Sequence, residues 1–125
     1  MRENVIQQKS FEFALRIILL SSKLRQERDY VLSKQLLRAG TSIGANVEEA
    51  QAAQSRRDFR SKMAIASKEA RETRYGLQEA RETHYGLRLI DASDLYAHDI
   101  RGELEEVEEL IRILTSIVKS AGGSQ

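Results

Sequence analysis

Few residues of this chain have the types and spacing that metal chemistry needs. The 125 residues include no cysteine and two histidines, His84 and His98, so thiolate chemistry and a multi-histidine metal centre are excluded. Asp94 precedes His98 by one helical turn, but such a pair is far more often a surface salt bridge or a helix cap. Arg81 lies three residues before His84, where di-iron bundles have a glutamate. We therefore expect no metal and no cofactor.

The hydroxyl side chains are also poorly placed for catalysis. Thr41 and Ser42 lie in the run Gly-Thr-Ser-Ile-Gly at residues 40–44, which superficially resembles a phosphate loop. The run lacks the Gly-Lys-Ser/Thr ending of such loops and lies inside a predicted helix, and the chain has no Gly-x-Ser-x-Gly elbow. We expect no catalytic residue and a protein that is not an enzyme.

Two pairs of carboxylates lie on helices that we predict to be neighbours: Glu48 with Glu49, and Glu69 with Glu72. Paired carboxylates can exchange protons with a substrate. Charged side chains on adjacent helices more often form ion pairs that fix the helix register or join subunits. We favour the ion-pair interpretation.

The distribution of charge carries the best indication of function. The net charge is +1, but residues 1–62 hold 12 basic and 7 acidic side chains, and residues 63–125 hold 8 and 12. Basic residues of the second and third predicted helices form a stripe that could contact phosphates by releasing counterions, with Tyr75 available for stacking. The alternative is a solvated face neutralised by Glu69, Glu72 and the glutamates of the fourth helix. The predicted nucleic-acid-binding residues are Lys34, Arg38, Arg57, Arg60, Lys68, Arg71 and Arg74.

The elements that position these residues are helices. The chain has no proline and seven glycines, so helical periodicity runs almost uninterrupted. Apolar spacing predicts helices over about 10–25, 30–53 and 56–90, and a fourth that starts near 91–94. Ser10 is the predicted N-cap of the first helix, and its core face is widened by Phe11, Ala14 and Ile18, while Ser55 begins a capping box before the third helix. We predict an all-α, antiparallel up-and-down four-helix bundle over residues 1–120, followed by a disordered tail at 121–125.

The centre of the second helix is rich in small residues. Small side chains allow two backbones to approach closely, so we predict that a partner helix crosses at Gly40, Thr41, Ser42 and Gly44. The alternative is a weak or kinked helix, because each interior glycine costs about 1 kcal/mol relative to alanine.

An internal repeat lies in the third helix. Residues 68–77, KEARETRYGL, recur at 78–87 as QEARETHYGL, which is a tandem duplication of natural or engineered origin. Ten residues advance a helix by about 1000°, so the second copy is turned by roughly 80°, with Leu87 to one side and Arg88 on the core face. A helix over 56–90 would extend about 52 Å, against about 36 Å for the second. The third helix is therefore unusually long, looped out near Gly76 or Gly86, or covered by neighbouring chains.

Composition narrows the class of protein. Hydrophobic residues make up 41% and charged residues 31%, which is typical of a soluble globular or oligomeric protein and not of a disordered one. No apolar run approaches the roughly 18 residues of a membrane span, and residues 1–13 contain no signal-peptide core. We expect a cytoplasmic protein.

Five stretches carry a resemblance to a known family. They are KSFEFA at 9–14, SKQLLRAGTSIGANVEEA at 33–50, QSRRDF at 54–59, KEARET at 68–73 and ILTSIVK at 113–119. Together they resemble the bacterial four-helix bundle proteins encoded in intervening sequences of 23S rRNA genes. The similarity spans nearly the whole chain, and its most specific part is the block RAGTSIGAN at 38–46.

The resemblance implies a homopentameric ring with a central opening. The chain is also similar to the accessory variability protein of diversity-generating retroelements, a pentameric bundle that binds a reverse transcriptase and nucleic acid through basic surfaces. The expected partners are therefore the chain itself, RNA and a reverse transcriptase, with no membrane and no catalytic residues. Gly76 and Gly86 stand where a tryptophan or another bulky residue commonly follows the tyrosine, so we expect a void or a thinner interface there.

Two interpretations of function follow. The first is a non-enzymatic, homo-oligomeric accessory protein that binds RNA or a nucleic-acid enzyme through the basic stripe. The second is a self-assembling structural protein with no nucleic-acid role.

Deletion of residues 78–87 tests whether the repeat changes geometry. The deletion restores Leu87 to the direction of Leu77, so we expect a change in stability, helix content or oligomer mass. Urea unfolding, circular dichroism and light scattering measure the three quantities. If none of them changes, the geometric interpretation is wrong.

Overall fold

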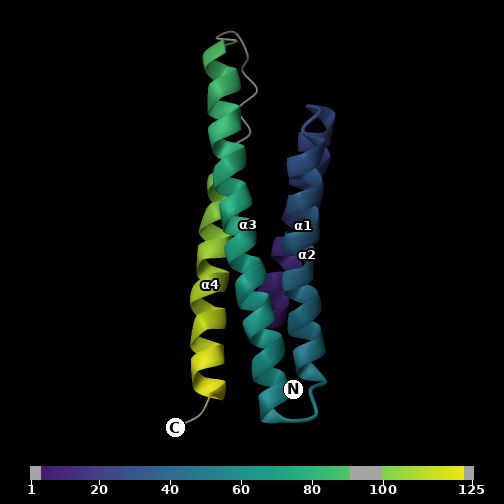
Figure 1. The fold of residues 1–125 in the computed structure, drawn as a ribbon, viewed down its shortest axis with the longest axis vertical. Helices are drawn as coiled ribbons and strands as arrows, with labels where there is room; N and C mark the ends of the chain where they lie inside the picture. Colours follow the sequence, from purple (N-terminus) through teal and green to yellow (C-terminus); the bar gives the residue numbers. More distant parts are fainter. Residues whose placement is uncertain (1–3, 91–99, 123–125) are drawn as a thin grey trace.

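Four α-helices and two short connections make up the described part of the chain (Figure 1). The computed structural model describes residues 4–90 and 100–122, and the side chains of all of these except 83–90. The helices are α1 (Val5–Gln26), α2 (Tyr30–Gln51), α3 (Arg56–Ile90) and α4 (Arg101–Ala121). Successive helices run in opposite directions in Figure 1, and each packs against the next, while α1 also contacts α4. The prediction of an all-α four-helix bundle is confirmed.

The start of α1 differs from the prediction. Asn4 is the N-cap, and its Oδ1 accepts hydrogen bonds from the backbone N–H groups of Ile6 at 3.0 Å and Gln7 at 3.3 Å. Ser10 lies buried inside the helix, where its hydroxyl donates to the carbonyl of Gln7. Ser10 was the wrong cap because no helix breaker separates it from Asn4, so the helix extends back to the earlier capping residue.

The two described connections hold well-defined caps. The α1–α2 turn contains Arg28 in the left-handed region, with φ of 69°, and Asp29 then caps α2 by accepting from the N–H of Leu32 at 3.2 Å. Ser55 accepts from the N–H of Asp58 at 3.0 Å, as the capping box predicts for α3. The predicted start of the fourth helix near 91–94 lies outside the described residues, and α4 begins at Arg101.

Most of the predicted core is buried, but the first helix has a narrower core face than predicted. The apolar residues that predict the second helix by their spacing are all buried: Leu32, Leu36, Ala39, Ile43, Val47 and Ala50. On α1, by contrast, Phe11 is 63% exposed and Ile18 is 45% exposed, so neither widens the core face. The error arises because an apolar residue at the edge of a helical stripe can face either the core or an outer surface. The buried residues of α1 are Ile6, Ser10, Phe13, Ile17, Leu20, Ser21 and Leu24.

The α1–α2 contact is close at two places. Ser21 and Ser33 are both buried, and each hydroxyl donates to the other residue's carbonyl oxygen, at 2.7 and 2.8 Å. Further along, a Cβ placed on Gly40 would lie 2.7 Å from Cγ2 of Ile17, which is inside van der Waals contact. The backbone of α2 therefore approaches α1 as closely as a residue without a side chain permits.

The rest of the small-residue block is less tightly packed. A Cβ on Gly44 would lie 3.6 Å from the carbonyl oxygen of Ser10, an ordinary contact distance. Thr41 and Ser42 are half-buried, and their hydroxyls donate to carbonyls of the preceding turn, those of Leu37 at 2.7 Å and Ala39 at 3.0 Å. Within this block, Gly40 makes the closest approach to α1.

The repeat lies within α3, which is 35 residues long and helical through both copies. In Figure 1, α3 extends farther than the turn that joins α1 to α2. The copies occupy different environments, since Glu69 is buried and its counterpart Glu79 is exposed. Both Ala70 and Ala80 are buried. The expected positions of Leu87 and Arg88 lie outside the described side chains.

No void accompanies Gly76. A Cβ at this buried position would lie 2.8 Å from Cδ2 of Leu36, so the side chain of Leu36 occupies the space. The expected void at Gly76 is therefore wrong, because a leucine of α2 packs onto the bare backbone. The side chains of residues 83–90, around Gly86, are outside the described part of the structure.

Arg16 and Lys9 of α1 form ion pairs with α4, and the α1–α4 contact is the least extensive of the four helix–helix contacts. The Nη1 of Arg16 donates to Oε2 of Glu106 at 2.7 Å, and its Nε lies 3.9 Å from Oε2 of Glu103. Glu103 is 6% exposed, and its Oε1 is buried with no hydrogen-bond partner among residues 4–90 and 100–122. The hydrogen bond with Glu106 raises the pKa of Arg16, so its guanidinium remains charged. Arg16 therefore supplies the positive charge beside a buried carboxylate.

Substitution of Gly40 tests the close α1–α2 approach. Gly40→Ala should lower the free energy of unfolding by about 1–3 kcal/mol, because the added methyl overlaps Ile17. The matched control is Gly44→Ala, which has room for the methyl and should be neutral or gain up to about 1 kcal/mol of helix propensity. Urea unfolding measures both. Equal stabilisation by the two substitutions would contradict the packing described.

Substitution of Arg16 tests the bridge to α4. Arg16→Ala should cost about 1–3 kcal/mol of stability, because it leaves the carboxylate of Glu103 buried without a cation. A second change, Glu103→Gln, should recover most of this loss. Lys9→Ala is the control, since its ion pair with Glu109 is half-exposed, contains no fully buried carboxylate and contributes about 0–1 kcal/mol. A loss no larger for Arg16→Ala than for Lys9→Ala would rule out the proposed role.

Candidate nucleic-acid interface

The seven basic residues predicted to bind nucleic acid lie on α2 and α3, which pack against each other. The helices position them, but neighbouring groups decide whether each cation is available to a ligand. The structure divides the seven into four that contact other parts of the bundle and three that do not.

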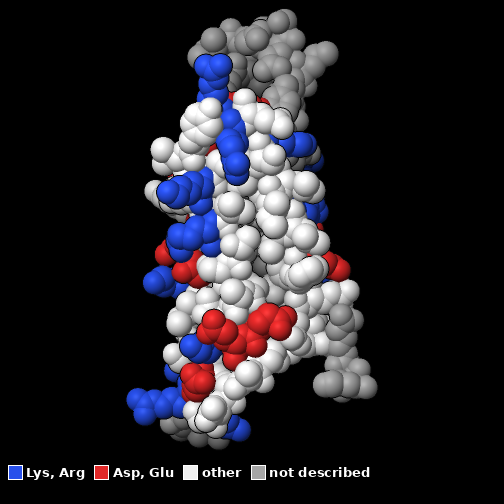
Figure 2. All heavy atoms as spheres, turned by 90° about the vertical axis from the view of Figure 1, so that its right-hand side faces the viewer, with Lys and Arg blue, Asp and Glu red and all other residues white. Residues whose placement is uncertain are grey.

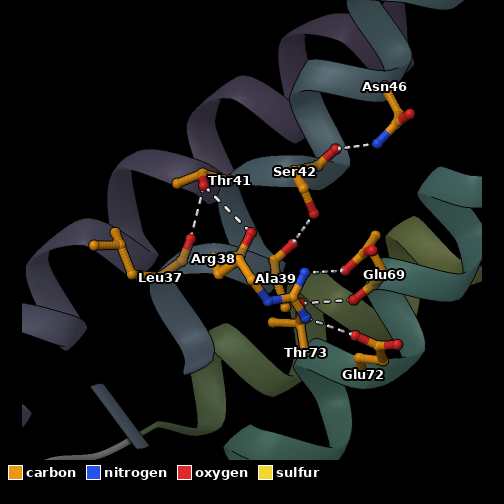
Figure 3. A network of polar contacts seen from close by, with 9 residues as sticks. All are labelled: Leu37, Arg38, Ala39, Thr41, Ser42, Asn46, Glu69, Glu72 and Thr73. Atoms are coloured by element: carbon orange, nitrogen blue, oxygen red, sulfur yellow. Dashed lines mark hydrogen bonds and ion pairs between the residues drawn. The ribbon is translucent and has the colours of Figure 1, made fainter. Parts of the chain in front are cut away.

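Arg38 joins α2 to α3 (Figure 3). Its Nη1 lies 3.4 Å from Oε1 of Glu69, and its Nη2 lies 2.9 Å from Oε1 of Glu72. The carbonyl oxygen of Glu69 also accepts a hydrogen bond from the hydroxyl of Thr73 at 2.8 Å. The charge of Arg38 is thus largely compensated within the chain.

Three arginines of α3 point toward α4. Arg74 forms an ion pair with Glu108 at 3.3 Å, and Arg71 donates to the hydroxyl of Thr115 at 3.1 Å. The Nε of Arg60 donates at 3.2 Å to the carbonyl oxygen of Val118 near the end of α4, which also accepts the backbone N–H of Gly122 at 3.0 Å. These side chains attach α4 to α3.

The other three cations extend into solvent. Lys34 on α2 and Arg57 and Lys68 on α3 are exposed, and none makes a hydrogen bond or ion pair with the described residues. Arg57, Lys68 and Tyr75 are spaced by 11 and 7 residues, which places them on one face of α3. The Tyr75 side chain is 70% exposed. A phosphate can approach these cations without breaking any internal contact.

Charge is unevenly distributed on the side of the molecule that α1 and α2 form. Figure 2 shows Lys and Arg side chains along one edge and over the upper half of this side, and Asp and Glu side chains mainly over the lower half. Uncharged side chains cover its middle. The basic edge is therefore separate from an uncharged central surface.

The carboxylates do not converge on one point. Glu49 pairs with Lys62 of α3 at 3.3 Å, and Glu48 accepts from the side-chain amide of Gln7 on α1 at 3.3 Å. Since Glu69 and Glu72 bind Arg38, all four predicted carboxylates contact other helices. This geometry fits ion pairing between helices and not a shared acid–base site.

Hydroxyl and metal chemistry find no support in the described residues. The hydroxyls of Thr41 and Ser42 are occupied by carbonyls of their own helix, and Ser42 in turn accepts from the amide of Asn46 through its backbone oxygen at 2.9 Å (Figure 3). Across residues 4–82 and 100–122, no three acidic or histidine side chains are grouped to hold a metal ion. His84, Asp94 and His98 lie outside these side chains.

A groove lies at one end of the bundle, between the start of α3 and the end of α4. Among the described residues that line it, Arg56 is the charged one. The lining residues of the groove are Arg56, Phe59, Ser116, Ile117, Ser120 and Ala121.

No helix within the part of the chain described here is both long enough and apolar enough to span a membrane.

The contacts of Arg16 with Glu103 and Glu106 were not predicted from the sequence. The two glutamates are three residues apart and so share one side of α4, a signal present in the sequence. Which helix that side faces depends on the rotation of α4, and spacing alone does not fix it.

Comparison with known proteins places these features in a family. The model of the family described as 23S rRNA-intervening sequence protein matches residues 2–116. A similar crystal structure is that of a protein with unknown function from the S23 ribosomal protein family of Bacteroides thetaiotaomicron. The two chains are 42% identical, the match covers 91% of this chain and 98% of that one, and the TM-score is 0.78. The comparison with curated proteins found no match.

Proposed function

The chain belongs to the 23S rRNA-intervening sequence protein family, and we propose that it is a cytoplasmic, non-enzymatic, self-associating bundle that binds RNA through α2 and α3. The observation that carries the proposal is the set of three exposed cations without an acidic partner among the described residues: Lys34, Arg57 and Lys68. A cation that already has a carboxylate partner gains little from a phosphate. These three have no such competitor and release counterions when they bind.

The face of α3 adds a second kind of contact. Arg57 and Lys68 are eleven residues apart, or about 16 Å along the helix axis, so they would contact different phosphates of one strand. Tyr75 presents an exposed ring on the same face, and an aromatic ring can stack on an unpaired base. Such a surface favours single-stranded RNA without strong sequence preference.

The remaining side chains support a binding role over catalysis. The hydroxyls of the small-residue block bond to backbone carbonyls, and the predicted carboxylates bond to other helices. The descriptions of the family and of the Bacteroides protein assign no reaction. The resemblance implies five copies in a ring, and we include self-association in the proposal on that ground.

A structural protein with no nucleic-acid role is the alternative. The observation that favours it is the internal pairing of Arg38, Arg60, Arg71 and Arg74, which contribute to the bundle itself. On this alternative, the three remaining cations are an ordinary solvated surface.

Salt-titrated binding of a short single-stranded RNA separates the two functions. We expect the affinity of the parent protein to fall as salt rises, and Arg57→Ala and Lys68→Ala each to reduce the slope of log K against log salt by about 0.7. The matched control is Arg74→Ala, which changes the net charge by the same amount but removes a cation already paired with Glu108. Its slope should equal that of the parent.

Two results would count against RNA binding at this surface. Undetectable or salt-insensitive binding by the parent would remove the RNA function and leave the structural alternative. Equal losses for Lys68→Ala and Arg74→Ala would show that net charge, and not the exposed cations of α3, governs binding.

A further inference from the structure

Helices α3 and α4 form a second basic surface, which includes cations of α4. Residues 56–71 of α3 run beside residues 111–122 of α4, and the hydrogen bonds of Arg60 and Arg71 to α4 join the two segments. We call the outward side of these two segments the α3–α4 surface. Residues 111–122 contain no aspartate and no glutamate. The end of α4 therefore brings no negative side chain to this surface.

The two acidic residues of the α3 segment, Asp58 and Glu69, are directed elsewhere. Glu69 is buried, and its Oε1 lies 3.4 Å from Nη1 of Arg38 on α2. Asp58 precedes Arg60 by two positions, or about 200° of helical turn, so the two side chains point to opposite sides of α3. Among the described residues, the α3–α4 surface thus has cations but no carboxylate.

Two arginines of α3 are held on this surface by uncharged oxygens. Arg71 donates to the hydroxyls of Thr115 at 3.1 Å and Ser67 at 3.5 Å. Arg60 donates through Nε to the carbonyl oxygen of Val118 at 3.2 Å. These bonds orient each guanidinium without neutralising its charge. A guanidinium has five N–H donors, and both side chains are exposed, so most of the donors remain available to a ligand.

Helix α4 adds two cations without an internal partner. Arg112 and Lys119 are exposed, and neither makes a hydrogen bond or ion pair with the described residues. They lie three residues before and four residues after Thr115, so the three side chains share one face of α4. The guanidinium of Arg71, which is bound to Thr115, therefore lies between the two along the helix axis.

We propose that the α3–α4 surface binds the phosphate backbone of an RNA strand. The proposal rests on the proposed function and deepens it, because it adds α4 to the binding surface and directs the strand along the α3–α4 interface. Oriented guanidinium groups bind phosphate oxygens in pairs, and each cation releases counterions. The cations that contact the phosphates are Arg60, Arg71, Arg112 and Lys119.

The spacing of these cations suits a strand and not a single phosphate. Arg60 and Arg71 are eleven residues apart, or about 16 Å along α3, and Arg112 and Lys119 are seven apart, or about 10 Å along α4. Each pair therefore contacts different phosphates. Because both rows follow the helix axes, the strand runs parallel to α3, in the same direction as the row of exposed cations on its outer face.

The opposite flank of α3 is less suited to phosphates. The cations between α2 and α3, Arg38 and Lys62, are both paired with glutamates. A phosphate placed there would lie close to those carboxylates, and like charges repel. On the α3–α4 surface no described carboxylate competes with the phosphate.

An anionic membrane fits the α3–α4 surface less well than RNA. A helix that lies on a bilayer inserts large apolar side chains next to its cations. Among the described residues, none of the exposed large apolar side chains belongs to α4. The groups beside the cations are instead hydroxyls, such as that of Thr115, which suit a polar backbone.

Salt-titrated binding of a short oligouridine RNA to the full-length chain tests the proposal. Arg112→Ala and Lys119→Ala should each reduce the slope of log K against log salt by about 0.7, the value for one phosphate contact with a single strand. Neither should change helix content, because neither side chain has a partner within the described structure. The matched control is Lys23→Ala, which removes an exposed cation of α1 that also has no such partner. Its slope should equal that of the parent.

Arg71→Ala separates binding from a structural role. We expect it to reduce the slope by about 0.7 as well. A purely structural arginine would lower stability in urea and leave the slope unchanged. The matched control is Thr115→Val, which removes the hydrogen bond but keeps the charge of Arg71, and it should retain the parent slope.

The outcomes separate this inference from the proposed function. If Arg112→Ala and Lys119→Ala match Lys23→Ala while the α3 variants of the proposed function reduce the slope, the α3–α4 surface is overturned and the proposed function stands. Slopes reduced by the α4 variants alone would support the α3–α4 surface and count against the outer face of α3. A parent that binds phosphatidylglycerol vesicles but no RNA would overturn both.

Discussion

The close approach of α1 and α2 at Gly40 fixes much of the remaining structure. With no side chain at this position, α2 lies against Ile17, and the reciprocal hydrogen bonds of Ser21 and Ser33 hold the same two helices together nearer their turn. These two contacts, both in the α1–α2 interface, set the rotation of α1 about its axis. That rotation directs Ile17 into the core and directs Phe11 and Leu15 away from it.

The two outer surfaces of the bundle follow from this arrangement. One is the outer face of α1, where Phe11, Leu15 and Leu19 are exposed. The other is the face of α3, where Arg57 and Lys68 are exposed, while Arg38 and Arg74 form ion pairs with glutamates and Arg60 bonds to α4. Internal ion pairs and hydrogen bonds thus divide the seven basic residues into four that join helices of the bundle and three that are exposed to solvent.

The fold and most of the core could be predicted because the spacing of residues such as Leu36, Ile43 and Val47 follows the helical period. Ser10 was wrongly predicted as the N-cap of α1. Asn4 is also a capping residue, and no helix breaker lies between the two, so the helix extends back to Asn4. Phe11 and Ile18 were misassigned because an apolar residue fits a core or an interface equally well. The partners of Arg38 could not be predicted, because they depend on the α2–α3 register, which is a property of packing and not of spacing.

The proposed function has two parts: the chain self-associates, and it binds RNA through exposed cations. Native mass spectrometry of the parent chain with a short single-stranded RNA, across a range of salt concentrations, tests both parts in one measurement. We expect a protein complex whose mass is a multiple of 14.2 kDa. It should carry RNA at low salt and lose the RNA, but not its protein subunits, as the salt concentration rises. A 14.2 kDa species without RNA at every salt concentration would contradict this expectation.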